Sequence, residues 1–218
     1  MGDALRSRRG TTRVTRLTME EKAAITSGRL LRVAADVIAE RGFAGTSVAI
    51  ITAKAEVATG SFYTYFESRE ALLRTIITNQ SQALRRQIAS AVAESPGFFI
   101  GEERSFRQYF RFLREKPSFI RLLNEAEAFL PDAYGEVKSQ IVNGYRKTLA
   151  KAAGRGEIRP LKGMELEGVA LFMMASRHYY GQQFLPKCDR KGEIPDRIVE
   201  MYMKFIRGGL ERAPETSG

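Results

Sequence analysis

The stretch that decides the fold is residues 29–73, RLLRVAADVIAERGFAGTSVAIITAKAEVATGSFYTYFESREALL. Its first part places apolar residues three and four apart and ends at Gly42, which is the pattern of an amphipathic helix closed by a glycine cap. Two shorter apolar patterns follow, from Ser47 to Ala55 and from Thr59 to Phe66, separated by a turn at residues 56–58. Two short helices joined by a tight turn are typical of a helix-turn-helix.

The second of these short helices has an inner and an outer face. Phe62 and Phe66 should face the core together, because residues at positions i and i+4 share one side of a helix. The other side chains then face outward. These outward residues are Thr59, Gly60, Ser61, Tyr63 and Thr64. A helix fits the major groove of DNA, so this face is the candidate for reading base edges.

The rest of the chain also predicts helices. Thr18 and Glu21 form a capping-box pattern that starts the first helix, and Ser68 caps a fourth helix that runs toward Val92. Further helices are expected at residues 106–113, 118–129, 133–153, 164–184 and 196–210. No segment shows the alternating apolar and polar pattern of a β-strand, so the prediction is an all-α chain of about nine helices. Its expected parts are a flexible basic arm (residues 1–17), a helix-turn-helix domain (18–67) and a larger helical domain (68–218).

Composition favours a soluble protein with an anionic partner. The formal net charge is +10 and the isoelectric point is about 9.9, which favours nucleic acid first and an acidic membrane surface second. Residues 1–18 lack the apolar core of a secretory signal, and the longest apolar stretch, residues 168–175, is much shorter than the roughly 20 residues that cross a bilayer. With one cysteine, Cys188, the chain cannot form an intrachain disulfide, and a reducing cytoplasm is the expected location.

Residues 29–73 closely resemble the DNA-binding domain of the TetR family of bacterial transcriptional regulators. The resemblance is carried by Ala34-Ala35, Gly42-Phe43, Thr46-Ser47-Val48, Gly60-Ser61-Phe62-Tyr63, Phe66 and Ser68-Arg69-Glu70-Ala71-Leu72-Leu73. It implies an all-helical homodimer whose first three helices bind double-stranded DNA and whose other helices bind a ligand and form the dimer. The implied function is a sequence-specific repressor that a small ligand releases from its operator.

Two residues depart from the family pattern in the turn between the two short helices. The family usually has glycine where this chain has Glu56, and a non-glycine residue at positive φ costs roughly 1–2 kcal/mol, so we expect a differently shaped turn. Ala58 stands where the family often has a serine N-cap, so capping of the third helix is expected to fall to Thr59.

The outward face of the third helix contains no Arg, Lys, Asn or Gln, the side chains that make bidentate contacts to guanine or adenine. Specificity is therefore expected to depend on hydroxyl groups, thymine methyl groups and DNA shape. The resemblance implies that Tyr63 and Tyr65 donate to phosphates, as does Thr46 or Ser47 at the start of the second helix, and that Arg69 clamps another phosphate. The alternative for the two tyrosines is aromatic packing, although helical spacing favours the DNA role for Tyr63.

The C-terminal helices and the N-terminal arm are the candidates for the dimer interface and for additional DNA contacts. The last two expected helices have long apolar faces, as in a dimer bundle with two helices from each subunit. Two recognition helices must be separated by one DNA turn, roughly 34 Å, or by a multiple of it, which predicts a palindromic operator. The arginines of the arm either contact DNA or belong to a solvated tail. They are Arg6, Arg8, Arg9, Arg13 and Arg16.

A ligand cavity is expected within the fourth to eighth helices, lined by apolar and aromatic groups with a few polar ones. The candidates are Phe106, Tyr109, Phe110, Phe119, Leu123, Glu127, Phe129, Ile141, Tyr145, Phe172, Met173, Ser176 and Arg177. Core packing explains each of these residues taken singly, and only the set indicates a cavity. Residues 114–160 loosely resemble regulators of this family that sense lipophilic acids or acyl thioesters, so the expected inducer is small, lipophilic and of acyl type.

Four charged or titratable residues interrupt these otherwise apolar helices: Glu125, Glu127, Arg177 and His178. A charge on an apolar face needs a partner, which is either an internal or interface ion pair or a polar group of the ligand. The ion pair is the simpler interpretation.

Two other classes of function stay open. The first is an enzyme. The chain has one histidine, one cysteine and no phosphate loop, so no catalytic residue, metal or cofactor is expected. An enzyme that uses only carboxylates for catalysis would not show these residues and stays an alternative. A nonspecific polyanion-binding protein would also carry this net charge. Competition with random DNA separates a specific regulator from a nonspecific binder.

Overall fold

The computed structural model describes residues 18–190 and 193–212, and the predicted basic arm lies outside these residues. The described residues form α-helices and one short 3-10 helix, with no strand among them. The helices are α1 (Met19–Arg41), α2 (Val48–Ala55), α3 (Thr59–Tyr65), α4 (Arg69–Val92), α5 (Phe98–Glu115), α6 (Phe119–Phe129), α7 (Pro131–Gly154), α8 (Gly163–Phe184), η1 (Leu185–Lys187) and α9 (Asp196–Leu210). The prediction of an all-α fold is confirmed.

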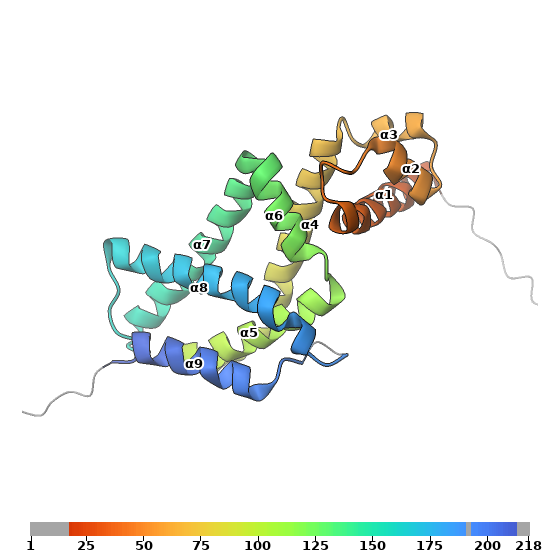
Figure 1. The fold of residues 1–218 in the computed structure, drawn as a ribbon. Helices are drawn as coiled ribbons and strands as arrows, with labels where there is room; N and C mark the ends of the chain where they lie inside the picture. The colour runs from red at the N-terminus through yellow and green to blue at the C-terminus, as the bar shows by residue number, and fades with distance from the viewer. Residues whose placement is uncertain (1–17, 191–192, 213–218) are drawn as a thin grey trace, which may run out of the picture.

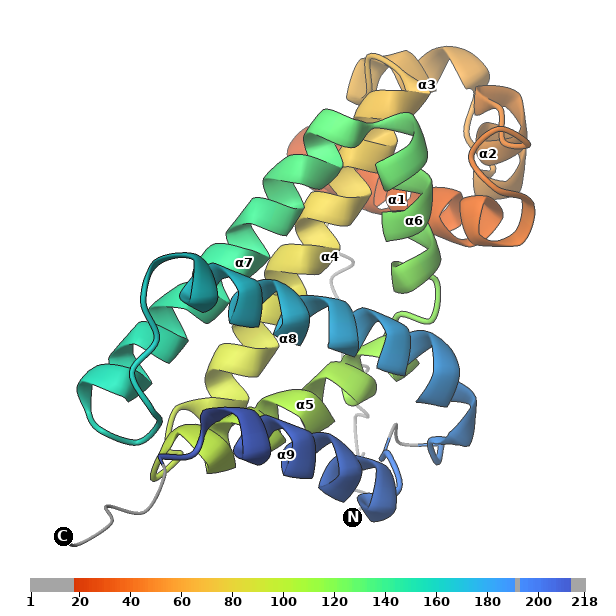
Figure 2. The same ribbon diagram turned by 60° about the vertical axis from the view of Figure 1, so that its left-hand side comes forward.

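Helices α1 to α3 pack together at one end of the molecule, and α4 leads from them into a larger helical body (Figure 1). In that body α7 runs beside α4, while α8 crosses α7 and α9 lies along α5 (Figure 2). Helix α6 is short and reaches back to α1, so it contacts both parts of the chain. Two helices, α4 and α6, thus connect the small helical unit to the body.

The first helix begins and ends where its sequence predicts. The Thr18 hydroxyl accepts from the Glu21 amide at 3.1 Å, and the Glu21 carboxylate accepts from the Thr18 amide at 2.7 Å. Gly42 ends the helix at φ 76°, a conformation that glycine adopts without a steric penalty. Both cap predictions are confirmed.

The turn after α2 corrects one expectation. Glu56 adopts the left-handed conformation, with φ 55° and ψ 44°, so the turn keeps the conformation that a glycine would take. The amide of Glu56 donates to the Ala53 carbonyl, and the amide of Val57 donates to the Thr52 carbonyl. This pair of bonds is a Schellman motif, which satisfies the last carbonyls of α2 and holds Glu56 in place despite its side chain.

The start of α3 corrects a second expectation. Ala58 is the N-cap residue, and no side chain caps the helix. The Thr59 hydroxyl, expected to act as the cap, lies 3.2 Å from the Thr52 hydroxyl on α2. That contact ties the two short helices together. Phe62 is fully buried, so α3 is held by packing into the core beside α2.

Helix α5 is longer than predicted, because a residue distant in sequence supports its first turn. The expected helix covered residues 106–113, whereas α5 begins at Phe98, directly after the turn that ends α4. The Phe98 amide donates to the carboxylate of Glu157 at 2.6 Å. No local pattern reveals a cap supplied by a residue almost sixty positions away, so the sequence did not predict this extension.

We predict that Glu56→Gly stabilises the protein. Removing the Cβ relieves a left-handed penalty of roughly 1–2 kcal/mol, and the greater freedom of glycine in the unfolded chain offsets part of it. The free energy of unfolding in urea should therefore rise by about 0.5–1 kcal/mol. Ala53→Gly is the matched control, because Ala53 has helical geometry in α2 and its replacement should cost about 1 kcal/mol. A less stable Glu56→Gly protein would contradict the strain argument.

Candidate DNA-binding face and ligand cavity

The outer face of α3 is open. Tyr63 is 60% exposed, and its ring packs edge-on against buried Phe62 with centroids 5.4 Å apart. Thr59, Gly60 and Thr64 are also exposed, and Ser61 is half-buried. A Cβ added to Gly60 would meet no heavy atom within 4 Å, so nothing in the described chain shields the helix backbone there. Another molecule can approach this face closely.

The other predicted DNA contacts differ in how accessible they are. Ser47 is exposed, and its hydroxyl caps α2 by accepting from the Ile50 amide at 3.2 Å. Thr46 is only 1% exposed, and its hydroxyl donates to the Gly42 carbonyl at 2.8 Å. Of this pair, only Ser47 presents its side chain to an outside phosphate. Tyr65 is half-buried and packs against the core, which agrees with the packing alternative.

Arg69, to which the resemblance assigns a DNA phosphate, makes several contacts inside the protein. Its guanidinium donates to the carbonyl of Phe43 at 3.0 Å and to the carbonyl of Thr46. It also lies over the Phe43 ring, 4.1 Å from the centroid, and 3.4 Å from the Glu70 carboxylate. Arg69 therefore fastens the segment between α1 and α2 to the start of α4.

Helix α6 holds the same segment from the other side. Glu125 accepts a hydrogen bond from the Phe43 amide at 2.8 Å, and the Phe129 ring packs against the Phe43 ring at 5.3 Å. A Cβ added to Gly42 would lie 3.2 Å from the Glu125 carboxylate, so glycine also makes room for this contact. Phe129, predicted to bind ligand, lies at this junction instead, and Glu125 has Arg121 as a distant ion-pair partner at 4.0 Å.

A cavity of about 720 Å³ lies among α4, α5, α6, α7 and α8. Much of its wall is apolar, with Leu84, Ile88, Val92, Val137 and Ile141 contributed by α4 and α7. The predicted ligand residues that line it are Tyr109, Phe119, Leu123, Glu127, Ile141, Tyr145 and Arg177. The sequence therefore located the cavity in the correct group of helices.

The other predicted ligand residues lie elsewhere. Phe106, Phe110 and Met173 are buried in the core, and the Phe106 ring stacks on Tyr202 at 3.9 Å. Phe172 is on the outer surface of α8, and the Ser176 hydroxyl donates to the Met173 carbonyl at 3.0 Å. On α8 the cavity is lined instead by Met174, Ala175, Arg177, His178 and Tyr179.

Two polar residues of α4, Ser81 and Arg85, line the cavity and were not predicted. They share a helix face with Leu84 and Ile88, because Leu84, Arg85 and Ile88 follow Ser81 by three, four and seven residues. A hydroxyl and a guanidinium on an otherwise apolar stripe are the sequence signal that could have identified them.

A buried ion pair crosses the cavity wall. The Arg177 guanidinium lies 2.7 Å from the Glu102 carboxylate, which also accepts from the Tyr202 hydroxyl at 2.6 Å. The guanidinium sits over the Tyr145 ring at 5.3 Å. Burial alone lowers the pKa of Arg177, but the charge of Glu102 raises that pKa well above its usual value, so Arg177 stays charged. The ion-pair interpretation is confirmed for Arg177, with a partner that the sequence did not identify.

The same environment keeps neighbouring groups neutral. Burial raises the pKa of Tyr109 and of Tyr145 well above the usual value for tyrosine. Burial also lowers the pKa of His178, with a smaller opposing effect from Glu127. The ion pair of Arg177 and Glu102 therefore lies beside groups whose neutral forms are favoured.

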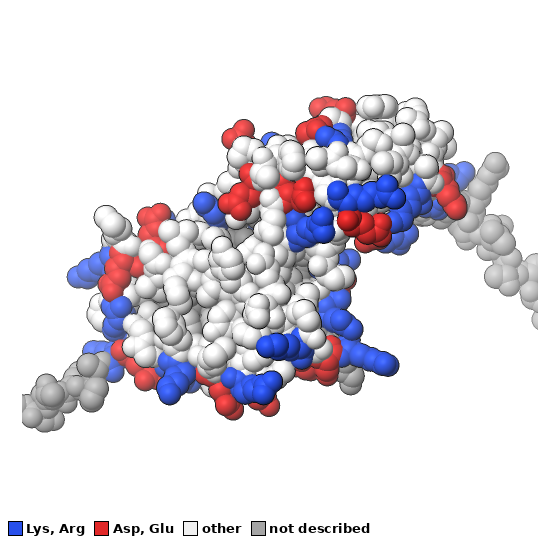
Figure 3. All heavy atoms as spheres, viewed as in Figure 1, with Lys and Arg blue, Asp and Glu red and all other residues white. Residues whose placement is uncertain are grey.

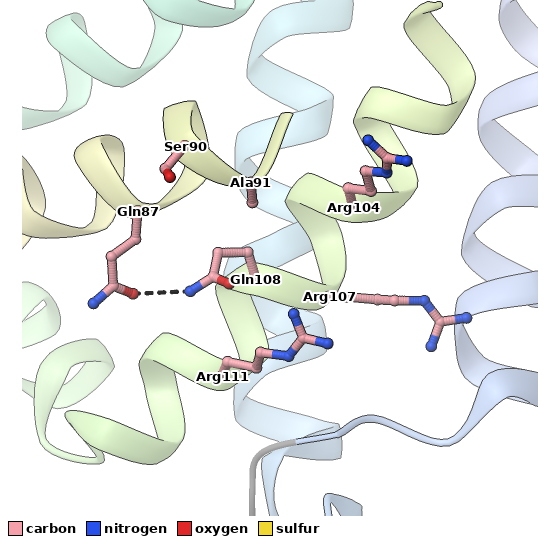
Figure 4. A pocket seen from close by; sticks show the side chains of 7 residues that line it. All are labelled: Gln87, Ser90, Ala91, Arg104, Arg107, Gln108 and Arg111. Carbon is pink, nitrogen blue, oxygen red and sulfur yellow. Dashed lines mark hydrogen bonds between the residues drawn. The ribbon is translucent and has the colours of Figure 1, made fainter. Parts of the chain in front are cut away.

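A second hollow lies between α4 and α5, and Figure 4 shows the side chains that line it. Gln87 and Gln108 hydrogen-bond to each other across it at 2.9 Å. The Arg107 guanidinium pairs with Asp196 at 2.8 Å, and the Arg111 guanidinium pairs with Glu193 at 2.7 Å. Because acidic side chains already neutralise these arginines, the hollow is a weaker candidate for an anionic ligand than the central cavity.

The outer surfaces of α8 and α9 expose apolar side chains. Phe172 and Phe205 stack at 5.2 Å, and Phe205 is 65% exposed. Met164, Leu171 and Met201 are exposed on the same two helices. The surface over the middle of the body carries few charged side chains, which gather at its margins (Figure 3). Exposed aromatic groups on a largely uncharged surface are typical of an interface.

The described residues contain neither a membrane-spanning helix nor a cluster of metal ligands. None of the described helices is both long enough and apolar enough to cross a membrane. No group of three or more His, Cys, Asp or Glu side chains within the described ranges is arranged to hold a metal ion.

Comparison with known proteins identifies the family. Residues 30–76 match the model for bacterial regulatory proteins of the tetR family. The chain is 35% identical over 196 residues to the HTH-type transcriptional repressor DhaR of Mycobacterium sp. (strain GP1), covering 86% of this chain and 96% of DhaR.

Solved structures agree with this assignment at the level of the fold. The fatty acid degradation regulator FadR from Bacillus halodurans superposes with a TM-score of 0.71 at 18% identity, over 83% of this chain and 94% of FadR. AibR, in a complex with isovaleryl coenzyme A and operator DNA, superposes with a TM-score of 0.64 at 19% identity, over 81% of this chain and 97% of AibR. These relatives are regulators of transcription, and DhaR matches nearly the whole chain. The protein therefore belongs to the TetR family of bacterial transcriptional regulators.

Proposed function

We propose that this protein is a homodimeric repressor that binds a palindromic operator and releases it when a small lipophilic ligand of acyl type enters the central cavity. The observation that carries the proposal is the pair of contacts on Phe43, which α4 holds through Arg69 and α6 holds through Glu125. Both helices also line the cavity. A ligand that moves either helix acts directly on the segment that positions α2 and α3.

The proposed DNA contacts lie on the exposed faces of α2 and α3. Tyr63 donates its hydroxyl to a phosphate, and Gly60 lets the α3 backbone approach the groove. Thr59, Ser61 and Thr64 offer hydroxyl and methyl groups to base edges, and Ser47 lies where the free amides at the start of α2 attract an anion. The half-buried position of Tyr65 supports packing as its main role. Few strong base contacts are available, so DNA shape contributes much of the specificity.

The proposed dimer interface is the exposed apolar surface of α8 and α9. Burying the stacked Phe172 and Phe205 rings against a second copy removes apolar area from water, which favours association at about 25 cal/mol per Å². A twofold axis through this surface gives two recognition helices related by symmetry. Such a pair matches a palindrome whose half-sites are about one DNA turn apart.

The cavity supports a lipophilic ligand because its walls combine long apolar stretches with a few polar groups. Two structural relatives have names that point to acyl chemistry: one is a fatty acid degradation regulator, and the other was solved with isovaleryl coenzyme A. Their low identity to this chain establishes only the fold. Their ligands therefore suggest, by analogy, the class to be tested first.

Coupling between cavity and DNA follows from the position of α6. Leu123 and Glu127 line the cavity, and Glu125, between them in sequence, holds the Phe43 amide. A ligand that displaces α6 strains or breaks this hydrogen bond and so changes the tilt of the DNA-binding unit. Allostery requires only that the ligand prefer the dimer whose recognition helices no longer match the groove spacing.

We predict that Tyr63→Phe weakens operator binding without changing stability. One hydrogen bond to a phosphate is lost from each subunit, so affinity should fall by roughly 3- to 10-fold for each bond. The operator is first selected from a random DNA library, and binding is measured by gel shift with excess random competitor. Ser139→Ala is the control, because it removes an exposed hydroxyl from α7, a helix that takes no part in the proposed DNA contacts. Full affinity of Tyr63→Phe would refute the contact, and equal binding to random DNA would refute sequence-specific regulation.

We predict that Phe205→Glu produces a folded monomer with much weaker operator binding. The side chain is largely exposed in the single chain, so a charge there spares the core but opposes burial in an interface. Sedimentation velocity gives the mass, and circular dichroism checks the helical content. Glu200→Lys is the control, since it alters a charge roughly 140° around α9 from Phe205. A dimeric Phe205→Glu protein would place the interface elsewhere.

We predict that Glu125→Ala uncouples ligand from DNA. The variant should bind ligand normally, but the ligand should change operator affinity by a smaller factor than the roughly 5- to 150-fold typical of allosteric coupling. The readout is the ratio of operator dissociation constants with and without decanoic acid or decanoyl coenzyme A. Glu136→Ala is the matched control, because Glu136 pairs with Arg74 of α4 at 3.4 Å without contacting Phe43. Unchanged coupling in Glu125→Ala would exclude α6 as the connection.

A further inference from the structure

Three buried polar atoms on the wall of the central cavity have no hydrogen-bond partner within the described chain. They are Oγ of Ser81, Nη1 of Arg85 and Nε of Arg177. Ser81 is 2% exposed and Arg177 is 5% exposed. Leaving a buried polar group unsatisfied is costly, so native proteins usually provide a partner for it. Three such groups around one cavity indicate that the partner is a ligand.

The unsatisfied atoms share one chemical property. The two arginine nitrogens can only donate, and the serine hydroxyl can donate as well. Ser81 and Arg85 are one turn apart on α4, so they present adjacent donors on the side that also carries Leu84 and Ile88. The missing partner is therefore an acceptor that sits beside an apolar body.

The protein supplies no carboxylate for Arg85. No ion pair to its guanidinium is found in the described ranges, unlike the guanidinium of Arg177. Three carboxylates line the cavity, and none of them is paired with Arg85 in the part of the chain that the structure describes. Glu102 binds Arg177 and Tyr202, Glu157 accepts from the Phe98 amide and lies 3.6 Å from Arg155, and Glu127 on α6 acts electrostatically on His178 and Tyr134. The arginines and lysines that line the cavity outnumber these carboxylates. This part of the wall thus has an excess positive charge that an anion would neutralise.

We propose that Arg85 and Ser81 bind the carboxylate of a lipophilic carboxylic acid, with Nε of Arg177 as a further donor from α8. This inference rests on the proposed ligand cavity and narrows its ligand from an acyl group in general to the free acid. A carboxylate offers two acceptor oxygens and a full negative charge, whereas a thioester offers one neutral carbonyl oxygen. The acyl chain lies along the apolar wall formed by Leu84, Ile88 and Ile141.

The first test compares ligands that differ only in the head group. Isothermal titration of the full-length protein with decanoic acid and with decan-1-ol separates the charge from the chain. We expect the acid to bind at least roughly 10-fold more tightly, because charge-assisted hydrogen bonds are stronger than neutral ones. Equal affinity for the acid and the alcohol would overturn the proposal.

The second test uses variants of the two α4 residues. Arg85→Gln should weaken decanoic acid binding by roughly 10- to 100-fold and leave decan-1-ol unchanged. Arg86→Gln is the matched control, since Arg86 is exposed on the same helix and does not line the cavity. If Arg85→Gln binds the acid as the wild type does, Arg85 is not the anchor.

Ser81→Ala should change thermal stability and acid binding in a combination that is not expected of a residue that only supports the fold. Because the hydroxyl is buried without a partner, its removal should raise the Tm of the ligand-free protein by roughly 2–4 °C while weakening acid binding several-fold. A variant that is less stable and binds the acid normally would show that Ser81 serves the fold instead.

A third comparison separates this inference from the proposed function. If decanoyl coenzyme A binds more tightly than decanoic acid and Arg85→Gln weakens both equally, the free acid is not the preferred ligand, but ligand-responsive repression stands. If the acid binds as expected in the cavity yet leaves operator binding unchanged, the carboxylate anchor stands and ligand-controlled release fails. Gel shifts run on the samples used for titration distinguish these outcomes.

Discussion

Phe43 joins the DNA-binding unit to the larger helical body through contacts of three kinds. Its carbonyl accepts from Arg69, its amide donates to Glu125, and its ring lies between the Arg69 guanidinium and the Phe129 ring. A buried backbone amide and carbonyl must be satisfied, so neither α4 nor α6 can move freely without a cost at this residue. The position of α2 and α3 therefore follows the two helices that also line the cavity.

The polar groups on the cavity wall differ in whether the protein supplies their partners. The charge of Arg177 is balanced by Glu102, which also accepts from the Tyr202 hydroxyl, although Nε of Arg177 has no partner within the described residues. Nη1 of Arg85 and Oγ of Ser81 have no hydrogen-bond partner in the same cavity, and an unsatisfied buried polar group costs stability. In the acid site that we propose, a bound acceptor would satisfy these groups and so stabilise the folded protein.

Local signals in the sequence predicted the helical framework. The features that the sequence did not predict depend on contacts between residues far apart in the chain. The Thr18 capping box, the Gly42 cap and the buried side of α3 each depend on residues within one or two turns. The start of α5 depends on Glu157, and the position of Arg69 depends on a carbonyl twenty-six residues earlier. Which aromatic residues line the cavity depends on helix rotation, which periodicity fixes only when the neighbouring helices are known.

In the homodimeric repressor that we propose, the weakness of each recognition helix lets a modest movement control operator binding. With no Arg, Lys, Asn or Gln on its outer face, α3 offers few strong base contacts, so operator affinity of the proposed dimer depends on both subunits binding at once. Simultaneous binding requires the spacing of the two helices to match the DNA turn. A ligand therefore does not need to unfold or block α3. It needs only to stabilise a tilt of α4 or α6 that moves one helix out of register while the other still fits.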